Sequence, residues 1–305
     1  MVNIAVFPGQ GSQTPGFLLP WLEREGAAET LATYSDWAGV DLTAAGTEWD
    51  ADRIRDTAVA QPLIVAASLL SWNMLDARDS VQGVAGHSVG EFAAAAAAGI
   101  LSEEDALRLV GIRGRAMARA AAHVETGMSA VIGGDQDAVV ARLDELGLTP
   151  ANYNGSGQIV AAGTLTSLAA LAADPPAGTR VIALQVAGAF HTSFMAPAVE
   201  SLRTAAADVT TTDPVPTVWS NSDGGAVSHG RAFLDALVTQ VASPVRWDRC
   251  MTSFADAGVS AIVELSPAGT LVGLAKRALR GVPSVALKSP DDIESARRLL
   301  TGESA

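Results

Sequence analysis

Short apolar runs that end in glycine-rich turns recur along the chain and predict buried strands. Val2–Phe7 is such a run, and the loop residues 8–13, with two glycines, follow it. Val81–Gly86 is a second run, followed by a tight turn at 87–90 and an alanine-rich helix, Glu91–Ala98, that ends at Gly99. A strand, a sharp turn and a helix in this order are typical of α/β folds.

Residues 128–186 show a different order of predicted strands and helices. Strands are predicted at 129–132, 149–153, 158–162 and 179–186, and helices at 135–146 and 166–173. That order, β-α-β-β-α-β, is the split-βαβ or ferredoxin-like motif. The sequence therefore predicts an α/β-hydrolase-like large domain with a mostly parallel sheet, residues 1–126 and 188–305. A ferredoxin-like subdomain, residues 127–187, is inserted into it.

The remaining segments complete the large domain. A helix over residues 102–122 begins with Ser102 and acidic residues that resemble a capping box. Beyond the insertion, the pattern predicts helices at 191–207, 230–241, 247–257 and 267–279, and strands at 214–220, 259–265 and 283–287.

Composition and charge narrow the classes of partner and location. With 49 % apolar and 17 % charged residues, the 305-residue chain can form a sizeable core. A formal net charge of −13 argues against nucleic acid or an anionic membrane as partner, although a local basic patch could still bind an acidic protein. No apolar stretch approaches the roughly 20 residues of a membrane span. The N-terminus lacks signal-peptide features and Cys250 is the single cysteine, so we expect a cytoplasmic protein.

The turn between the second strand and its helix carries a candidate nucleophile. Gly86-His87-Ser88-Val89-Gly90 matches Gly-x-Ser-x-Gly, the nucleophile elbow, in which serine sits on a sharp strand-to-helix turn. The positive end of the helix beyond the turn favours an oxyanion. The alternative is that Ser88 only caps that helix.

Serine needs a base to take its proton, and His191 is the best placed of the four histidines. His87 adjoins the nucleophile, His123 ends a helix and His229 lies in a polar stretch. His191 instead follows the last strand of the inserted motif and precedes a helix, where the chain re-enters the large domain. A purely structural histidine is the alternative.

Arg113 lies on the apolar stripe of the helix 102–122, together with Ala106, Val110 and Met117 at helical spacing. A buried guanidinium requires an anion or other acceptors. The partner is either an internal Asp or Glu or a substrate carboxylate, which the planar guanidinium binds with two hydrogen bonds.

These residues together resemble the malonyl-CoA:acyl-carrier-protein transacylases of fatty-acid synthesis and the acyltransferase domains of polyketide synthases, over residues 3–288. The stretches that carry the resemblance are Phe7-Pro8-Gly9-Gln10-Gly11-Ser12-Gln13, Gly86-His87-Ser88-Val89-Gly90-Glu91, Ile112-Arg113-Gly114-Arg115, Gly188-Ala189-Phe190-His191 and Gln240-Val241-Ala242-Ser243-Pro244-Val245.

The resemblance implies a role for each matching position. Ser88 is the acylated nucleophile, His191 its base, and Arg113 the clamp for the malonyl carboxylate. The backbone N–H groups of Gln10 and Val89 form the oxyanion hole, and a carbonyl at Gln240 orients the histidine in place of the usual Asp. Phe190 matches a malonyl-selecting signature, from which the chain departs at Gly188, where polyketide domains usually have His. Lys276 and Arg277 are candidates for carrier-protein docking, or else a solvated helix end.

The implied reaction moves malonyl from malonyl-CoA to the phosphopantetheine thiol of holo-acyl carrier protein through malonyl-Ser88, in fatty-acid or polyketide biosynthesis. It needs no metal or redox cofactor. The oligomeric state stays open, with a monomer as the default expectation. Two other functions remain open from the sequence. A serine hydrolase or thioesterase would use water as acceptor, and a non-enzymatic acyl-carrier-binding subunit would keep the fold without the chemistry.

Overall fold

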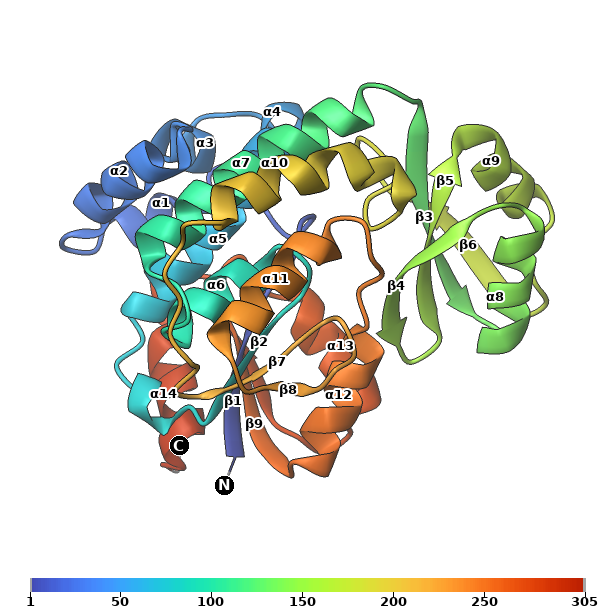
Figure 1. The fold of residues 1–305 in the computed structure, drawn as a ribbon. Helices are drawn as coiled ribbons and strands as arrows, with labels where there is room; N and C mark the ends of the chain where they lie inside the picture. The colour runs from blue at the N-terminus through green and yellow to red at the C-terminus, as the bar shows by residue number, and fades with distance from the viewer. Residues whose placement is uncertain (1, 304–305) are drawn as a thin grey trace.

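The computed structural model describes residues 2–303, and its larger sheet has six strands in the order β10-β9-β1-β2-β7-β8 (Figure 1). Every neighbouring pair is parallel except β7 and β8. The strands are β1 (Val2–Phe7), β2 (Gly83–Gly86), β7 (Thr217–Trp219), β8 (Ala226–Val227), β9 (Val259–Glu264) and β10 (Ser284–Ala286). The fold is therefore mixed α/β with a mostly parallel main sheet, as the strand–turn–helix pattern predicts.

Alternate residues of β1 point to opposite faces of this sheet, and both faces are covered. Ala5 and Phe7 pack into the larger core together with α5, α6 and α7, whereas Ile4 and Val6 pack against α12 and α13. The helices around the sheet are α1 (Leu19–Leu22), α2 (Ala27–Ala38), α3 (Leu42–Thr47), α4 (Ala51–Arg55), α5 (Thr57–Asn73), α6 (Gly90–Ala97), α7 (Glu103–Ala121), α10 (Ala196–Ala206), α11 (Gly230–Gln240), α12 (Trp247–Asp256), α13 (Thr270–Ala278) and α14 (Ile293–Thr301).

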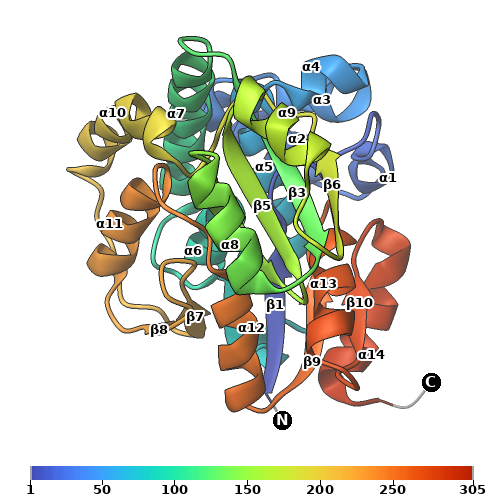
Figure 2. The same cartoon turned by 90° about the vertical axis from the view of Figure 1, so that its right-hand side faces the viewer.

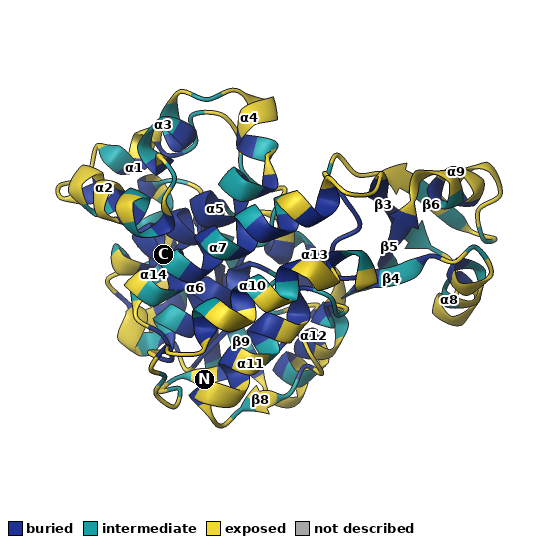
Figure 3. Cartoon of the chain, turned by 45° about the horizontal axis from the view of Figure 1, so that its top comes forward, coloured by how far each residue is buried: buried dark blue, intermediate teal, exposed yellow. Residues whose placement is uncertain are grey.

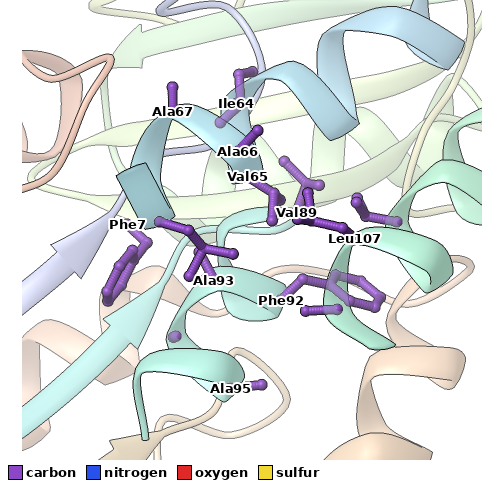
Figure 4. Close-up of a cluster of buried hydrophobic side chains, with 14 of the residues drawn as sticks. Phe7, Ile64, Val65, Ala66, Ala67, Val89, Phe92, Ala93, Ala95 and Leu107 are labelled. Atoms are coloured by element: carbon purple, nitrogen blue, oxygen red, sulfur yellow. The ribbon is translucent and has the colours of Figure 1, made fainter. Parts of the chain in front are cut away.

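Helix α5 is the centre of the larger core. Its residues from Ala60 to Trp72 are all buried, and Ile64 and Val65 belong to the same buried cluster as Phe7, Phe92 and Leu107 (Figure 4). A helix that is buried on every side has no amphipathic period, which is why the sequence pattern gave no prediction for residues 57–73. The shorter helices α1 to α4, within residues 19–55, were not predicted either. Figure 3 shows this buried interior surrounded by helices with exposed outer faces.

The second sheet is antiparallel throughout, with strand order β4-β5-β3-β6 (Figure 2). Its elements are β3 (Thr126–Gly133), α8 (Gln136–Glu145), β4 (Thr149–Gly155), β5 (Gln158–Thr164), α9 (Leu165–Ala173) and β6 (Thr179–Ala183). Helices α8 and α9 cover its outer face and form a separate small core with it. Strand β4 meets the large domain at the loop between α11 and α12, where Tyr153 N–H donates to Val245 O at 2.9 Å.

Several predicted boundaries differ from the structure. The strand expected at 179–186 ends at Ala183, and the strand expected at 214–220 is limited to Thr217–Trp219. The helix expected from His191 begins only at Ala196, after a short 3₁₀ turn at Ser193–Met195, because His191 has a φ of 61°, which is outside the helical region. None of the helices between residues 2 and 303 is both long and apolar enough to cross a membrane.

Candidate active site

The turn between β2 and α6 is possible only with glycine on both sides of Ser88. A Cβ on Gly86 would lie 2.1 Å from Glu91 N, and one on Gly90 would lie 2.2 Å from Phe7 O. Both neighbours are backbone atoms and cannot move aside. Ser88 itself has a φ of 53°, a left-handed conformation that costs a serine about 1–3 kcal/mol and is typical of functional turns. The surrounding structure therefore holds this serine in a sharp elbow.

Ser88 and His191 are 103 positions apart in the chain and meet in the structure. Ser88 Oγ lies 2.7 Å from His191 Nε2, and His191 Nδ1 lies 2.9 Å from the backbone oxygen of Gln240 at the end of α11. Because a carbonyl can only accept, Nδ1 carries the proton and Nε2 is free to accept the Ser88 proton. The Ser88 side chain makes no capping hydrogen bond to α6, whose N-cap is Val89.

The imidazole of His191 is held neutral. Its side chain is buried, and burial together with the positive charge of Arg113 lowers the pKa of His191 to about 3. A neutral imidazole at physiological pH is the form that a general base requires. The φ of 61° at His191 is a second left-handed residue in the same site.

Arg113 projects from α7 into the same region and is only 1 % exposed. Its Nη1 donates to Gln61 Oε1 at 2.6 Å and its Nη2 to Gln240 Oε1 at 3.2 Å, while Nε has no partner among residues 2–303. Burial lowers the pKa of Arg113 to about 10, which leaves it positively charged near neutral pH. No Asp or Glu within the described part of the chain forms an ion pair with it. The cation is therefore held by neutral amides and keeps donors for an incoming anion.

These groups line one cavity of about 290 Å³ between the two sheets. Ser88, His191 and Arg113 lie on its large-domain side, with Phe190 beside the histidine. Met128, Ala130 and Val160 of the small sheet, and Thr270, Leu271 and Leu274 of α13, close the other sides. The cavity thus combines an apolar wall with a nucleophile, a base and a buried cation.

Gln10 and Val89 border this cavity from the two loops that follow β1 and β2. The backbone N–H of each makes no hydrogen bond within residues 2–303. Unpaired N–H groups next to a serine hydroxyl are the donors from which an oxyanion hole is built.

The two candidate docking residues lie outside the cavity. Lys276 and Arg277 are exposed at the C-terminal end of α13, whose first half lines the cavity wall. Neither forms an ion pair with another described residue. Both charges are thus free on the helix that borders the cavity.

Sequence reasoning missed several polar residues of the site. Glu91 is 1 % exposed and accepts hydrogen bonds from Asn221 N, at 2.7 Å, and from Gln240 Nε2. Asn221 Oδ1 in turn accepts from Ser88 N at 2.7 Å, and Gln61 supports Arg113. Burial raises the pKa of Glu91, and the Asn221 N–H and the charge of Arg113 act in the opposite direction. The one available signal was a carboxylate directly before the apolar residues of α6.

The chain is similar to known proteins over almost its whole length. The Acyl transferase domain family matches residues 4–297. The "Malonyl CoA-acyl carrier protein transacylase" of Mycobacterium tuberculosis H37Rv is 54 % identical over 296 residues, covering 96 % of this chain and 98 % of that protein.

Two solved structures superpose over almost the whole chain. The crystal structure of MCAT from Mycobacterium tuberculosis has a TM-score of 0.94 and 52 % identity, covering 97 % of this chain and 100 % of that one. A complex described as a type II PKS acyl-carrier protein with its malonyl-transacylase has a TM-score of 0.90 and 29 % identity, covering 98 % and 99 %.

Proposed function

The chain belongs to the acyl transferase domain family and, within it, to the malonyl-CoA:acyl-carrier-protein transacylases, and from that membership we propose how its own residues carry out the reaction. The enzyme transfers the malonyl group of malonyl-CoA to the thiol of holo-acyl carrier protein. The observation that carries the residue assignment is the 2.7 Å contact between Ser88 Oγ and His191 Nε2, in one cavity with the Arg113 cation.

The first half-reaction acylates Ser88. His191 Nε2 takes the hydroxyl proton as Oγ attacks the thioester carbonyl, and the Gln240 carbonyl holds the imidazole in the required tautomer. The backbone N–H groups of Gln10 and Val89 stabilise the oxyanion, each by roughly 3 kcal/mol. When the tetrahedral intermediate collapses, the proton on Nε2 passes to the leaving CoA sulfur and malonyl-Ser88 remains.

Arg113 selects the acyl group by its charge. The free N–H groups of the guanidinium bind the terminal carboxylate of malonyl, which keeps the acyl chain inside the cavity with its thioester end at Ser88. An acetyl group offers no such anion. Phe190 beside the base narrows the space around the α-carbon and disfavours a methyl branch, an effect of about 1–3 kcal/mol.

The second half-reaction releases the malonyl group. The phosphopantetheine thiol of the carrier protein gives its proton to His191 Nε2 and attacks the malonyl ester, and Ser88 Oγ recovers the proton as the ester breaks. Lys276 and Arg277, exposed on the helix that borders the cavity, dock the acidic carrier protein. The reaction as written uses no metal or redox cofactor.

Further features belong to the same proposal. The elbow after a parallel strand supports an α/β-hydrolase-like large domain, residues 1–126 and 188–305. The β-α-β-β-α-β order supports a ferredoxin-like insertion at 127–187. A monomer in the cytoplasm, with no membrane or nucleic-acid partner, accords with the net charge and the single cysteine.

Intact-protein mass spectrometry tests this function directly. The wild-type protein should gain one malonyl group from malonyl-CoA and lose it again when holo-acyl carrier protein is added, while Ser88→Ala gains none. An adduct on Ser88→Ala would disprove the nucleophile. Rapid loss of the adduct to water without carrier protein would indicate a thioesterase instead.

A further inference from the structure

Glu91 is a buried carboxylate that the reaction as written does not use. It lies in the first turn of α6, three residues after Ser88, and is only 1 % exposed. It does not border the substrate cavity; with Gln240 it borders a separate cavity of about 560 Å³ that shares no lining residue with the first. A carboxyl group buried in this way costs free energy unless both of its oxygens are hydrogen-bonded.

The two carboxylate oxygens of Glu91 connect both sides of the site. Oε1 accepts from the backbone N–H of Asn221, whose side chain accepts from Ser88 N at 2.7 Å and donates to Gly86 O at 2.8 Å. Oε2 accepts from the side-chain amide of Gln240. Glu91 is thus linked to the nucleophile's turn and to the residue whose carbonyl holds His191.

Gln240 transmits the effect of Glu91 to the guanidinium. Its Nε2 donates to Glu91 while its Oε1 accepts from Arg113 Nη2 at 3.2 Å. An amide has one accepting and one donating end, so the carboxylate on one side fixes which end faces the arginine. Both oxygens of Glu91 accept from other groups, Asn221 N–H and the Gln240 amide, so Glu91 does not occupy the guanidinium of Arg113.

We propose that Glu91 is a positioning residue for malonyl selection: through the amide of Gln240 it holds Arg113 ready for the substrate carboxylate. The inference rests on the proposed function. It assigns to Glu91 no contact with the substrate and no proton transfer.

One substitution distinguishes a hydrogen-bonding role of Glu91 from a role in packing alone. Glu91→Gln keeps the shape but brings an NH₂ group. The Asn221 N–H cannot turn over, so the new amide oxygen must face it, and the new NH₂ then faces Gln240. Gln240 can accept from that NH₂ group only by turning its side-chain oxygen away from Arg113. The NH₂ group of Gln240 then faces Arg113 Nη2, and both are donors. The substitution should therefore weaken the binding of the malonyl carboxylate by Arg113.

The experiment compares malonyl-CoA and acetyl-CoA as donors to holo-acyl carrier protein. For Glu91→Gln we expect kcat/KM with malonyl-CoA to fall about tenfold more than with acetyl-CoA, mainly through KM. Glu104→Gln, the same change on an exposed residue of α7, should leave the malonyl-to-acetyl ratio at the wild-type value. In an Arg113→Ala background, Glu91→Gln should change that ratio less than about twofold, because the two residues act on one interaction.

Gln240→Met provides a second route if Glu91→Gln does not fold. It removes the amide but keeps the backbone carbonyl that contacts His191, so it should reproduce the malonyl-specific loss. Equal losses for both donors, an unchanged ratio, or a full further loss in the Arg113→Ala background would each overturn the proposal. If the wild-type enzyme itself fails to transfer malonyl to the carrier protein, the proposed function is wrong rather than the role of Glu91.

Discussion

Replacing Arg113 by alanine removes a buried cation from the wall of the substrate cavity. In the structure, the guanidinium uses two of its five N–H donors on the amide oxygens of Gln61 and Gln240, and its Nε has no partner among residues 2–303. Burial lowers the pKa of Arg113 only to about 10, so the group is charged throughout the pH range of an assay near neutrality. The variant therefore loses a charged clamp.

The expected loss of activity with malonyl-CoA follows from the burial of the ion pair between Arg113 and the malonyl carboxylate. Removing one partner of a buried, hydrogen-bonded charge pair costs about 3–5 kcal/mol. At about 1.4 kcal/mol for each factor of ten, kcat/KM for malonyl-CoA should fall by roughly two to four powers of ten. Acetyl-CoA carries no carboxylate and should react as well as, or better than, with the wild type, since an unbalanced cation no longer borders its methyl group.

The assay measures kcat/KM for both donors with holo-acyl carrier protein as acceptor. Arg115→Ala is the matched control, because Arg115 lies on the same helix but donates to Ala38 O, away from the cavity. Thermal unfolding of each variant checks that the fold persists.

A malonyl-to-acetyl ratio in Arg113→Ala within about threefold of the wild type would refute the reasoning, since a lost charge pair must change that ratio far more. A fall of the same size in Arg115→Ala would show that the loss comes from the helix and not from the clamp.

Four further predictions concern stability, docking and selection. Between pH 6.5 and 5 the wild type should lose up to ~1.4 kcal/mol of unfolding free energy per pH unit relative to His191→Gln, as measured by urea denaturation. The reason is that the pKa of His191 is near 6.5 in the unfolded chain but about 3 in the folded one, so that only the unfolded chain takes up a proton in this range. Gly90→Ala should lower the unfolding free energy by about 3 kcal/mol or more, whereas Gly273→Ala, with no atom within 4 Å of the new Cβ, should raise it by about 0.5–1 kcal/mol. Lys276→Glu should raise the KM for holo-acyl carrier protein several-fold at low salt and weaken the salt dependence of that KM. Phe190→Ala should raise the rate with methylmalonyl-CoA relative to malonyl-CoA by about tenfold.

Each of these has a result that would count against it. Parallel pH profiles of the wild type and His191→Gln would mean that His191 is not held neutral by burial. A Gly90→Ala protein as stable as Gly273→Ala would mean that the elbow has room for a side chain. If charge reversal at Lys276 left the salt dependence unchanged, the carrier protein would dock elsewhere. An unaltered methylmalonyl preference in Phe190→Ala would remove that ring from substrate selection.

Local pattern was enough to predict the features that depend on neighbours in the chain. The glycines around Ser88 indicated a turn that only glycine allows, and the structure explains this by backbone atoms 2.1 and 2.2 Å from the missing Cβ positions. The helical spacing of Arg113 with apolar residues indicated its burial, which is nearly complete. The order of strands and helices between residues 126 and 183 could likewise be predicted, because short elements with clear periods carry their own signal.

Only the tertiary structure decided which distant groups meet. It brought Ser88 within hydrogen-bond distance of His191, and it gave Arg113 two amide oxygens where the sequence left a choice between an internal acid and a substrate. Glu91 offered no comparable pattern, because an acidic residue in the first turn of a helix is ordinary and its burial depends on segments more than a hundred positions away. Side-chain periodicity reports which face of an element is apolar, whereas hydrogen bonds between elements depend on packing that no local pattern encodes.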